Sequence, residues 1–218
     1  MKATAAATTW HGGQGADRPA YEVRPLLTPA ARAEAAALVE DRIHALAALH
    51  IAPPYPHAPA VFREDQTEAV GLYENDAEAV LAGCLVLHRH HDLRHWGGDD
   101  SEPGLLVSLA HTAPDRDGRT GWRMTMWLRD YADRLQTPWV YAEAPRWHAG
   151  DDRAVGRLLS HLRDLGWEVL GSGRRPEGQR VARLRLAATA TPGLAAMIHC
   201  AVPLTTAYGP RAEQAAAR

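Results

Sequence analysis

The chain has few cysteines, little net charge and no long apolar run, and each of these absences argues against a class of protein. We interpret its two cysteines, Cys84 and Cys200, as reduced thiols in apolar surroundings rather than as a disulfide. The formal net charge of −2 provides no strong positive field, so we expect no nucleic-acid and no membrane partner. No apolar run approaches the roughly 20 residues that a membrane-spanning helix requires.

Lysine is nearly absent, and the sequence shows no export signal. Lys2 is the only lysine, so nearly every basic side chain is an arginine. The N-terminal residues lack the apolar stretch of a signal peptide, which predicts a cytoplasmic protein. The length of 218 residues and the hydrophobic content of 46% predict one domain with a proper core. We expect a flexible N-terminal tail at 1–19, the domain at 20–204 and a loose C-terminal tail at 205–218.

The spacing of apolar and turn-forming residues predicts a mixed α/β chain with the element order β-α-β-β-β-α-β-α-β-β. Thr28 and Pro29 are typical of the N-cap and first position of a helix. Gly166 is expected in the left-handed position that ends another helix. In chain order, the predicted elements are a strand at 21–27, a helix at 28–50, strands at 69–73, 78–91 and 105–111, a helix at 121–135, a strand at 138–144, a helix from 151 or 152 to 165, and strands at 167–170 and 181–187.

The connections between these elements are predicted from proline, glycine and turn residues. The prolines between residues 53 and 59 indicate an irregular connection up to residue 67. Asn75 and Asp76 form the turn of a hairpin between the second and third strands. We expect loops at 93–104 and 171–179, and residues 193–200 are ambiguous but compatible with a short helix.

The segment from Leu105 to Tyr131 combines a strand, a polar turn and the start of a helix. The turn, Arg116 to Gly121 with the sequence RDGRTG, is rich in arginine and backbone N–H groups. A helix N-terminus carries partial positive charge and unpaired N–H donors, and it therefore suits a phosphate group. The alternative is an ordinary solvated connection between a strand and a helix.

With this order of elements, the chain resembles the GNAT family of N-acetyltransferases over residues 21–187. The family signature between the fourth strand and its helix is R/Q-x-x-G-x-G/A. Arg116, Thr120 and Gly121 lie in that frame, while Arg119 takes the place of the middle glycine and Gly118 lies one residue early. The later helix ends in Leu-Gly-Trp at 165–167, which is similar to the Leu-Gly-Phe ending of the family.

The resemblance implies a fold and a co-substrate. The implied fold is mixed α+β, with a central, mostly antiparallel sheet, splayed fourth and fifth strands, and helices on both faces. The implied co-substrate is acetyl-CoA or another acyl-CoA, whose acyl group goes to a primary amine of a small molecule by direct attack. The resemblance implies a pantetheine contact along Leu109, Ala110 and His111, and a pyrophosphate contact at Arg116, Asp117, Gly118, Arg119, Thr120 and Gly121.

The chain departs from the family at the general acid. A tyrosine is usual four residues before the glycine of the helix ending, but that position holds Leu162, and residues 151–167 contain no tyrosine. His161 is a nearby substitute that could protonate a thiolate near neutral pH, and Ser160 is another; His161 could equally be a surface histidine. For the base, Glu143 at the end of the fifth strand is the best-placed carboxylate, and His111 is the alternative.

Histidines and tryptophans outside these positions have competing interpretations. His88 and His90 share one face of a strand and could begin a zinc site, but the further ligands would come from a glycine-rich loop, so we expect no metal. Trp96 and Trp147 fall in loops, where they could bind an apolar or aromatic amine or simply anchor the loops.

The departures from the family pattern leave two functional alternatives. One is a non-catalytic module on the same fold that binds an acyl-CoA or a protein partner, suggested by Arg119 and the missing tyrosine. The other is an acyltransferase that takes its acyl group from a longer-chain or carrier-protein-bound donor. The sequence is also compatible with a homodimer.

Overall fold

One eight-stranded sheet forms the centre of the molecule, in the strand order β6-β7-β5-β4-β3-β2-β1-β8. The computed structural model describes residues 19–89, 103–116, 119–145, 152–175 and 178–204, and the predicted tails lie largely outside these ranges. Its elements are β1 (Tyr21–Pro25), α1 (Pro29–Ala48), α2 (Ala58–Arg63), β2 (Ala69–Asn75), β3 (Ala79–His88), β4 (Gly104–Thr112), α3 (Thr120–Arg134), β5 (Trp139–Pro145), α4 (Asp152–Asp164), β6 (Glu168–Arg174), β7 (Arg180–Ala187), α5 (Leu194–Met197) and β8 (Ile198–Cys200).

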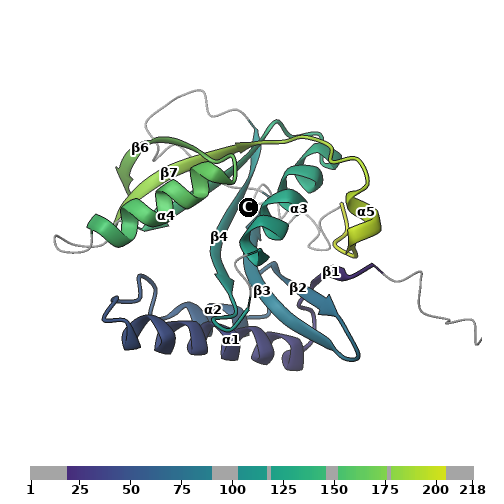
Figure 1. Ribbon diagram of the computed structural model, residues 1–218, viewed down its shortest axis with the longest axis horizontal. Coiled ribbons are helices and arrows are strands. Elements are labelled where there is room, and N and C mark those ends of the chain that lie inside the picture. The colour runs from purple at the N-terminus through teal and green to yellow at the C-terminus, as the bar shows by residue number, and fades with distance from the viewer. Residues whose placement is uncertain (1–18, 90–102, 117–118, 146–151, 176–177, 205–218) are drawn as a thin grey trace, which may run out of the picture.

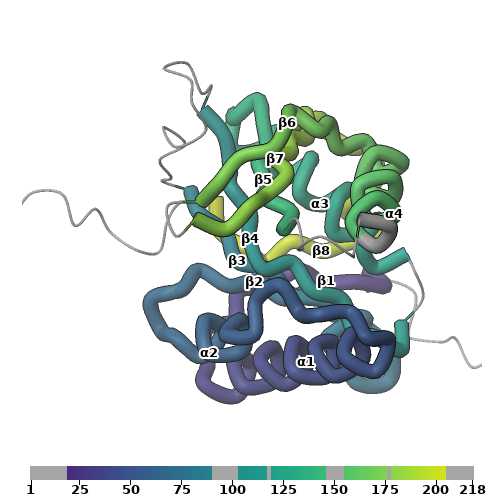
Figure 2. Tube along the Cα trace, turned by 90° about the vertical axis from the view of Figure 1, so that its left-hand side faces the viewer, coloured from purple at the N-terminus to yellow at the C-terminus, as the bar shows by residue number. Residues whose placement is uncertain are grey.

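The sheet is mostly antiparallel, and its two parallel pairs are β4 with β5 and β1 with β8. The helices α1 and α2 lie together on one side of the sheet, while α3 and α4 lie on the other (Figures 1 and 2). The predicted architecture, a mostly antiparallel sheet with helices on both faces, is therefore confirmed. None of the helices in the described ranges is long and apolar enough to cross a membrane.

The helix α1 begins where its capping residues predict. The Thr28 side chain accepts a hydrogen bond from the backbone N–H of Ala31 at 3.1 Å, and Pro29 occupies the first helical position, where its missing N–H is harmless. One face of α1 carries Arg32, which is 3% exposed. Its guanidinium donates to four backbone oxygens between the last turn of α2 and the start of β2: those of Phe62, Glu64, Asp65 and Thr67, at 2.6–3.4 Å.

Two connections predicted as irregular contain regular structure. The prolines between residues 53 and 59 lead into α2, and Pro59 falls in the first turn of this helix, where proline is tolerated. The predicted loop at 171–179 is wrong over its first part, since β6 continues to Arg174 and pairs with β7. This strand lies at the sheet edge and is largely exposed, so its sequence has no apolar alternation.

The C-terminal region adds a strand that the sequence does not reveal. Residues 193–200, which the sequence leaves ambiguous, contain the short helix α5, but residues 198–200 form β8, which pairs in parallel with β1. The following residues are held by Arg89, whose side chain is 7% exposed. Arg89 forms an ion pair with Glu68 at 2.7 Å and donates to the backbone oxygens of Pro203 at 2.8 Å and Leu204 at 3.0 Å.

Two apolar clusters hold the helices to the sheet. On the α3 side, Trp127 and Tyr131 stack with ring centroids 5.1 Å apart, and Met124, Leu128 and Ala132 are buried beside them. The helical spacing of apolar residues in the sequence predicts this face as Met124, Leu128, Tyr131, Ala132 and Leu135, and the structure adds Trp127 to it. On the α1 side, a second cluster gathers around Phe62 and Tyr73, both fully buried.

Candidate functional site

The parallel pair β4–β5 separates halfway along its length. The two strands pair from Gly104 with Trp139 up to Val107 with Ala142, and the ladder ends there. Beyond that point β4 contains a β-bulge, because its register against β3 shifts and the backbone of Leu109 is left-handed, with φ of 49°. A bulge bends its strand and increases the local twist. The bulge therefore turns β4 away from β5 and accounts for the predicted splay.

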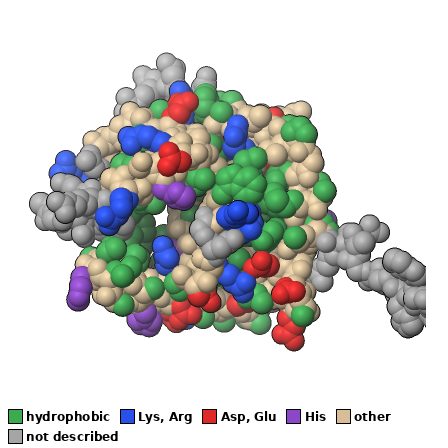
Figure 3. All heavy atoms as spheres, in the orientation of Figure 1, with side chains coloured by type: hydrophobic (Ala, Val, Ile, Leu, Met, Phe, Trp, Pro, Cys, Tyr) green, Lys and Arg blue, Asp and Glu red, His purple; other side chains and the backbone are tan. Residues whose placement is uncertain are grey.

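The molecule is hollowed at this side of β4. Figure 3, in the orientation of Figure 1, shows an opening between the part of the molecule that holds α4 and the part that holds α1. A gap between two diverging strands leaves backbone groups without a neighbouring strand. The splay is thus open to an extended ligand between the two helical layers.

The start of α3 lies at the splayed end of β4. A Cβ added at Gly83 of β3 would lie 3.0 Å from the backbone oxygen of His111 and 3.3 Å from the methyl group of Thr120. The N-cap residue, Arg119, makes no side-chain capping hydrogen bond, and the first turn contains no acidic side chain. The helix begins at Thr120, one residue earlier than predicted. Its positive end therefore lies at the splayed end of β4, and the first turn has no carboxylate to neutralise it.

The predicted acid, His161, lies beside this helix start. A Cβ built on Gly121 would have the Nε2 atom of His161 as its nearest neighbour, at 3.9 Å. The His161 side chain is exposed on α4, as is that of Ser160. Leu162 occupies the position where the family has tyrosine and packs against the core cluster under α3. The structure therefore brings His161 to the predicted phosphate turn and leaves no hydroxyl at residue 162.

The side chain of Arg116 is engaged at a different place. Its Nη1 atom lies 2.6 Å from a carboxylate oxygen of Glu74, at the end of β2, and the Tyr21 hydroxyl donates to the other oxygen at 3.2 Å. Arg116 thus fixes the turn to the sheet through its side chain. Asp117 and Gly118, two further residues of the predicted phosphate turn, lie outside the described residues.

His111 points to the opposite side, into the cluster under α1 and α2. Its ring meets that of Phe62 edge-on, with centroids 6.4 Å apart and an interplanar angle of 71°. Its Nε2 atom is buried and has no hydrogen-bond partner among the described residues. Burial, assisted by the positive charge of Arg42, lowers the pKa of His111 to about 4. The imidazole is therefore neutral at physiological pH.

Glu143 is the first residue of β5 beyond the part that pairs with β4. One of its carboxylate oxygens lies 2.6 Å from the Nε atom of Arg175, and the two side chains are 7% and 21% exposed. The Arg175 guanidinium lies over the ring of Tyr55, 4.9 Å from its centroid, and Gln179 donates to the backbone oxygen of Pro54 at 3.3 Å. The β6–β7 connection therefore reaches across to the α1–α2 connection.

Sequence reasoning missed Tyr55, Arg175 and Gln179. All three lie in connections, where neither helical nor strand periodicity applies, and their contacts join parts of the chain that are far apart. The available sequence signal is the proline and glycine around these residues. It indicates a connection between elements but does not show which other connection it contacts.

The structure describes only one of the two histidines that could begin a zinc site. The ring of His88 lies 2.8 Å from the Ser108 hydroxyl on the neighbouring strand, whereas His90 lies outside the described residues. Within the described ranges, no group of three metal-binding side chains is close enough together to hold an ion.

Solved structures share this architecture. A protein of the GNAT acetyltransferase family from Desulfovibrio desulfuricans is 14% identical, with a TM-score of 0.54, over 78% of this chain and 100% of its own. A GNAT-family acetyltransferase from Listeria monocytogenes is 11% identical, with a TM-score of 0.54, over 76% and 95%. The aminoglycoside N(6')-acetyltransferase from Legionella pneumophila is 10% identical, with a TM-score of 0.51, over 78% and 93%. No protein-family model and no curated protein sequence matches the chain.

Proposed function

We propose that this chain, which has the GNAT fold, is an acyl-CoA-dependent N-acyltransferase that moves an acetyl group to a primary amine of a small molecule. The observation that carries the proposal is the parallel pair that opens after Val107 and Ala142, directly beside the start of α3. An extended donor with a phosphate at one end matches a strand-like gap that leads to a positive helix end. The Legionella enzyme, whose name specifies an amine-bearing small molecule, supports this class of acceptor.

In this proposal the donor follows β4. The pantetheine arm bonds to the backbone of Leu109, Ala110 and His111, which lie beyond the last residue pair of β4 with β5. The pyrophosphate accepts hydrogen bonds from the backbone of the turn at 116–121. Arg116 contributes through its backbone, because its side chain is bound to Glu74.

The reaction needs one base and a destination for a second proton. Glu143 takes a proton from the acceptor ammonium, and the neutral amine attacks the thioester carbonyl carbon. A C–N bond forms, the C–S bond breaks, and the second proton of the nitrogen passes to the thiolate, giving an amide and free CoA. His111 is less suited to be the base, because its ring packs against Phe62 in the cluster under α1 and α2 and its Nε2 atom is buried there.

His161 fits the phosphate end of the donor. It lies beside Gly121 on the turn that receives the pyrophosphate, and the thioester is separated from that group by the whole pantetheine arm. We therefore assign His161 to a phosphate contact. In this assignment a water molecule delivers the proton to the thiolate. An activity that survives His161→Ala, with a raised KM for acetyl-CoA, would support this assignment over a role as general acid.

Calorimetric titration with acetyl-CoA tests the donor site directly. Binding heat and a rise in melting temperature are expected, and the absence of both at millimolar acetyl-CoA would overturn the proposal. Release of free CoA with a panel of amines then tests turnover. Binding without turnover would favour the non-catalytic module, for which the pairing of Glu143 with Arg175 is the supporting observation. Competition by longer acyl-CoAs distinguishes acetyl transfer from transfer of longer chains.

A further inference from the structure

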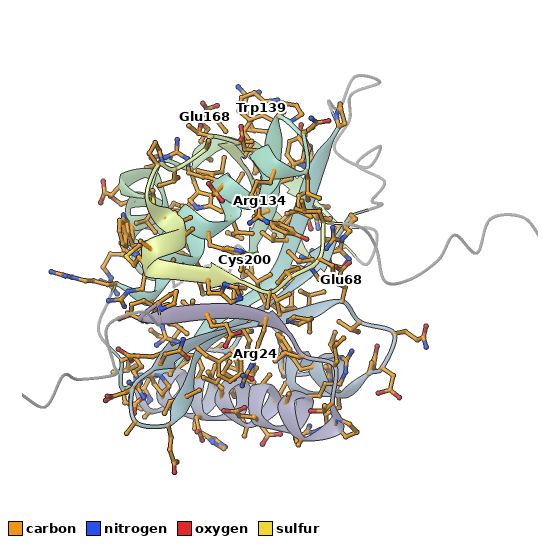
Figure 4. All side chains as sticks on the ribbon, turned by 90° about the vertical axis from the view of Figure 1, so that its right-hand side faces the viewer. Arg24, Glu68, Arg134, Trp139, Glu168 and Cys200 are labelled. Atoms are coloured by element: carbon orange, nitrogen blue, oxygen red, sulfur yellow. The ribbon has the colours of Figure 1, made fainter. Side chains whose placement is uncertain are left out.

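A cavity of about 390 Å³ lies between the second half of α3 and the C-terminal segment. Its described lining comes from α3, between Trp127 and Arg134, and from the chain between Thr191 and Cys200. Figure 4 shows Arg134 and Cys200 on the face of the molecule where the C-terminal helix α5 (yellow) lies. The cavity has the size of pockets that bind small molecules, about 300–1,000 Å³, and the proposed acyl transfer does not use it.

The buried part of the cavity lining is apolar. Trp127, Leu194 and Ile198 line the cavity, and all three are buried members of the apolar cluster under α3. The indole N–H of Trp127 donates to the Cys200 sulfur at 3.3 Å, so the polar atom of this ring is already bound within the protein. An apolar group that enters the cavity therefore leaves water for apolar surface, which is favourable.

Asp130 and Arg134 bring one charge of each sign to the same cavity. They lie one turn apart on α3, a spacing that puts their Cβ atoms about 5–6 Å from each other. Asp130 accepts the backbone N–H of Thr191 at 3.0 Å with one oxygen, and its second oxygen makes no hydrogen bond within the described residues. Over the same residues, the exposed Arg134 guanidinium makes no hydrogen bond and no ion pair. The two charges are thus available to a ligand rather than paired with each other.

We propose that this cavity binds a free α-amino acid with an apolar side chain, a function that goes beyond the proposed acyl transfer. The ammonium group binds the second oxygen of Asp130, and the carboxylate binds Arg134 and the exposed His199 of β8. The side chain of the amino acid covers the apolar part of the lining. A ligand with both charges leaves neither Asp130 nor Arg134 uncompensated. A simple carboxylic acid would instead bring its charge against Asp130, and a simple amine would bring its charge against Arg134.

The cavity is separate from the proposed donor site. Its described lining contains no residue of the turn at 116–121 and none of β4 or β5. At about 1.5 Å per residue, Trp127 lies about 10 Å further along the axis of α3 than Thr120. An amino acid is therefore expected to bind without displacing acetyl-CoA.

Calorimetric titration of the full chain with L-leucine, L-methionine and L-phenylalanine tests the proposal. At least one of them is expected to bind with a Kd of about 1 mM or tighter. Analogues of the best binder then test each charge; for leucine, 4-methylpentanoate lacks the ammonium group and 3-methylbutylamine lacks the carboxylate. Each analogue should bind at least about tenfold more weakly than the amino acid. Absence of binding by all three amino acids, or an analogue that binds as tightly as the amino acid, would overturn the proposal.

Substitutions in the cavity locate the binding. Asp130→Asn keeps an acceptor for the Thr191 N–H and removes the negative charge, while Arg134→Gln removes the positive charge. Each should weaken binding of the amino acid at least about tenfold. Asp133→Asn on α3 and Arg163→Gln on α4 are the matched controls, because both residues are exposed and lie outside the lining, and they should bind as the wild type does. Wild-type affinity in both cavity variants, or the same loss in the controls, would refute the site.

Titration of the same samples with acetyl-CoA keeps this proposal distinct from acyl transfer. An amino acid that competes with acetyl-CoA would refute a separate cavity. Binding of the amino acid without binding of acetyl-CoA would leave the cavity site standing and remove acyl transfer, and the reverse result would remove the cavity site alone. If a charge variant does not fold, Ala195→Trp, which adds bulk to the lining from α5, should abolish binding of the amino acid, and retained binding would refute the site.

Discussion

Gly121→Asp should change donor affinity and fold stability in opposite directions. Gly121 is the second residue of α3, and the nearest atom to an added Cβ is His161 Nε2 at 3.9 Å, an ordinary contact, so a side chain fits. A carboxylate in the first turn of a helix is stabilising by about 0.3–1 kcal/mol. The same carboxylate repels a bound pyrophosphate. At about 6 Å and an effective dielectric constant of about 40, one pair of unit charges costs about 1.4 kcal/mol, a tenfold loss of affinity.

Calorimetric titration with acetyl-CoA at low salt measures the loss, and urea denaturation measures stability. Gly121→Asn is the control, since asparagine has nearly the same shape without the charge. The gap in affinity between the Asp and Asn variants should narrow at about 1 M salt, where the screening length is about 3 Å. A folded Asp variant with wild-type affinity for acetyl-CoA would refute the proposed phosphate site at the turn. Equal losses of affinity in the Asp and Asn variants would show that the bulk of the side chain, and not its charge, is responsible.

Three other substitutions probe features of the fold. Thr28→Ala removes the cap of α1 and should cost about 1 kcal/mol in urea denaturation, while Thr28→Ser should retain most of the stability. Arg32→Lys should destabilise by about 3 kcal/mol, because a single ammonium cannot reproduce the fork that reaches four carbonyl groups; a loss below about 1 kcal/mol would contradict this. The pKa of His111 is lowered to about 4 in the folded protein, so the unfolded chain binds more protons between about pH 4 and 6.5. The free energy of unfolding should therefore decrease as the pH is lowered through that window. In His111→Leu the slope of stability against pH should be shallower there by up to about 1.4 kcal/mol per pH unit, and an unchanged slope would show that His111 is not the group responsible.

The parts of the fold that the sequence predicts are those set by local chemistry. Thr28 and Pro29 mark the start of α1 because capping involves neighbouring residues. Gly166 adopts the left-handed backbone, with φ of 92°, that ends a helix. The α3 face is predicted because every fourth or third residue is apolar, and the opening of β4 from β5 follows from the resemblance to the GNAT fold.

The parts that escape prediction depend on partners distant in the sequence. The strand β8 has three residues, too few for an alternating pattern, and exists because β1 has a free side for it. The pair of Glu143 with Arg175 forms because two connections meet across the splay. At Glu143, the sequence identifies a suitable carboxylate but cannot show that an arginine already neutralises it.

The parallel pairing of β1 with β8 determines when this edge of the sheet can be completed during protein synthesis. Among the described strands, β1 is the first along the chain and its partner β8 is the last, so one side of β1 lacks this partner while the intervening chain is translated. Figure 4 shows the short C-terminal strand, near the Cys200 label, beside β1, which carries Arg24. An unpaired strand side is a template for association with other chains. A chain that ends before Ile198 therefore leaves this side of β1 open to association with other chains, and it also leaves Arg89 without the carbonyl groups of Pro203 and Leu204.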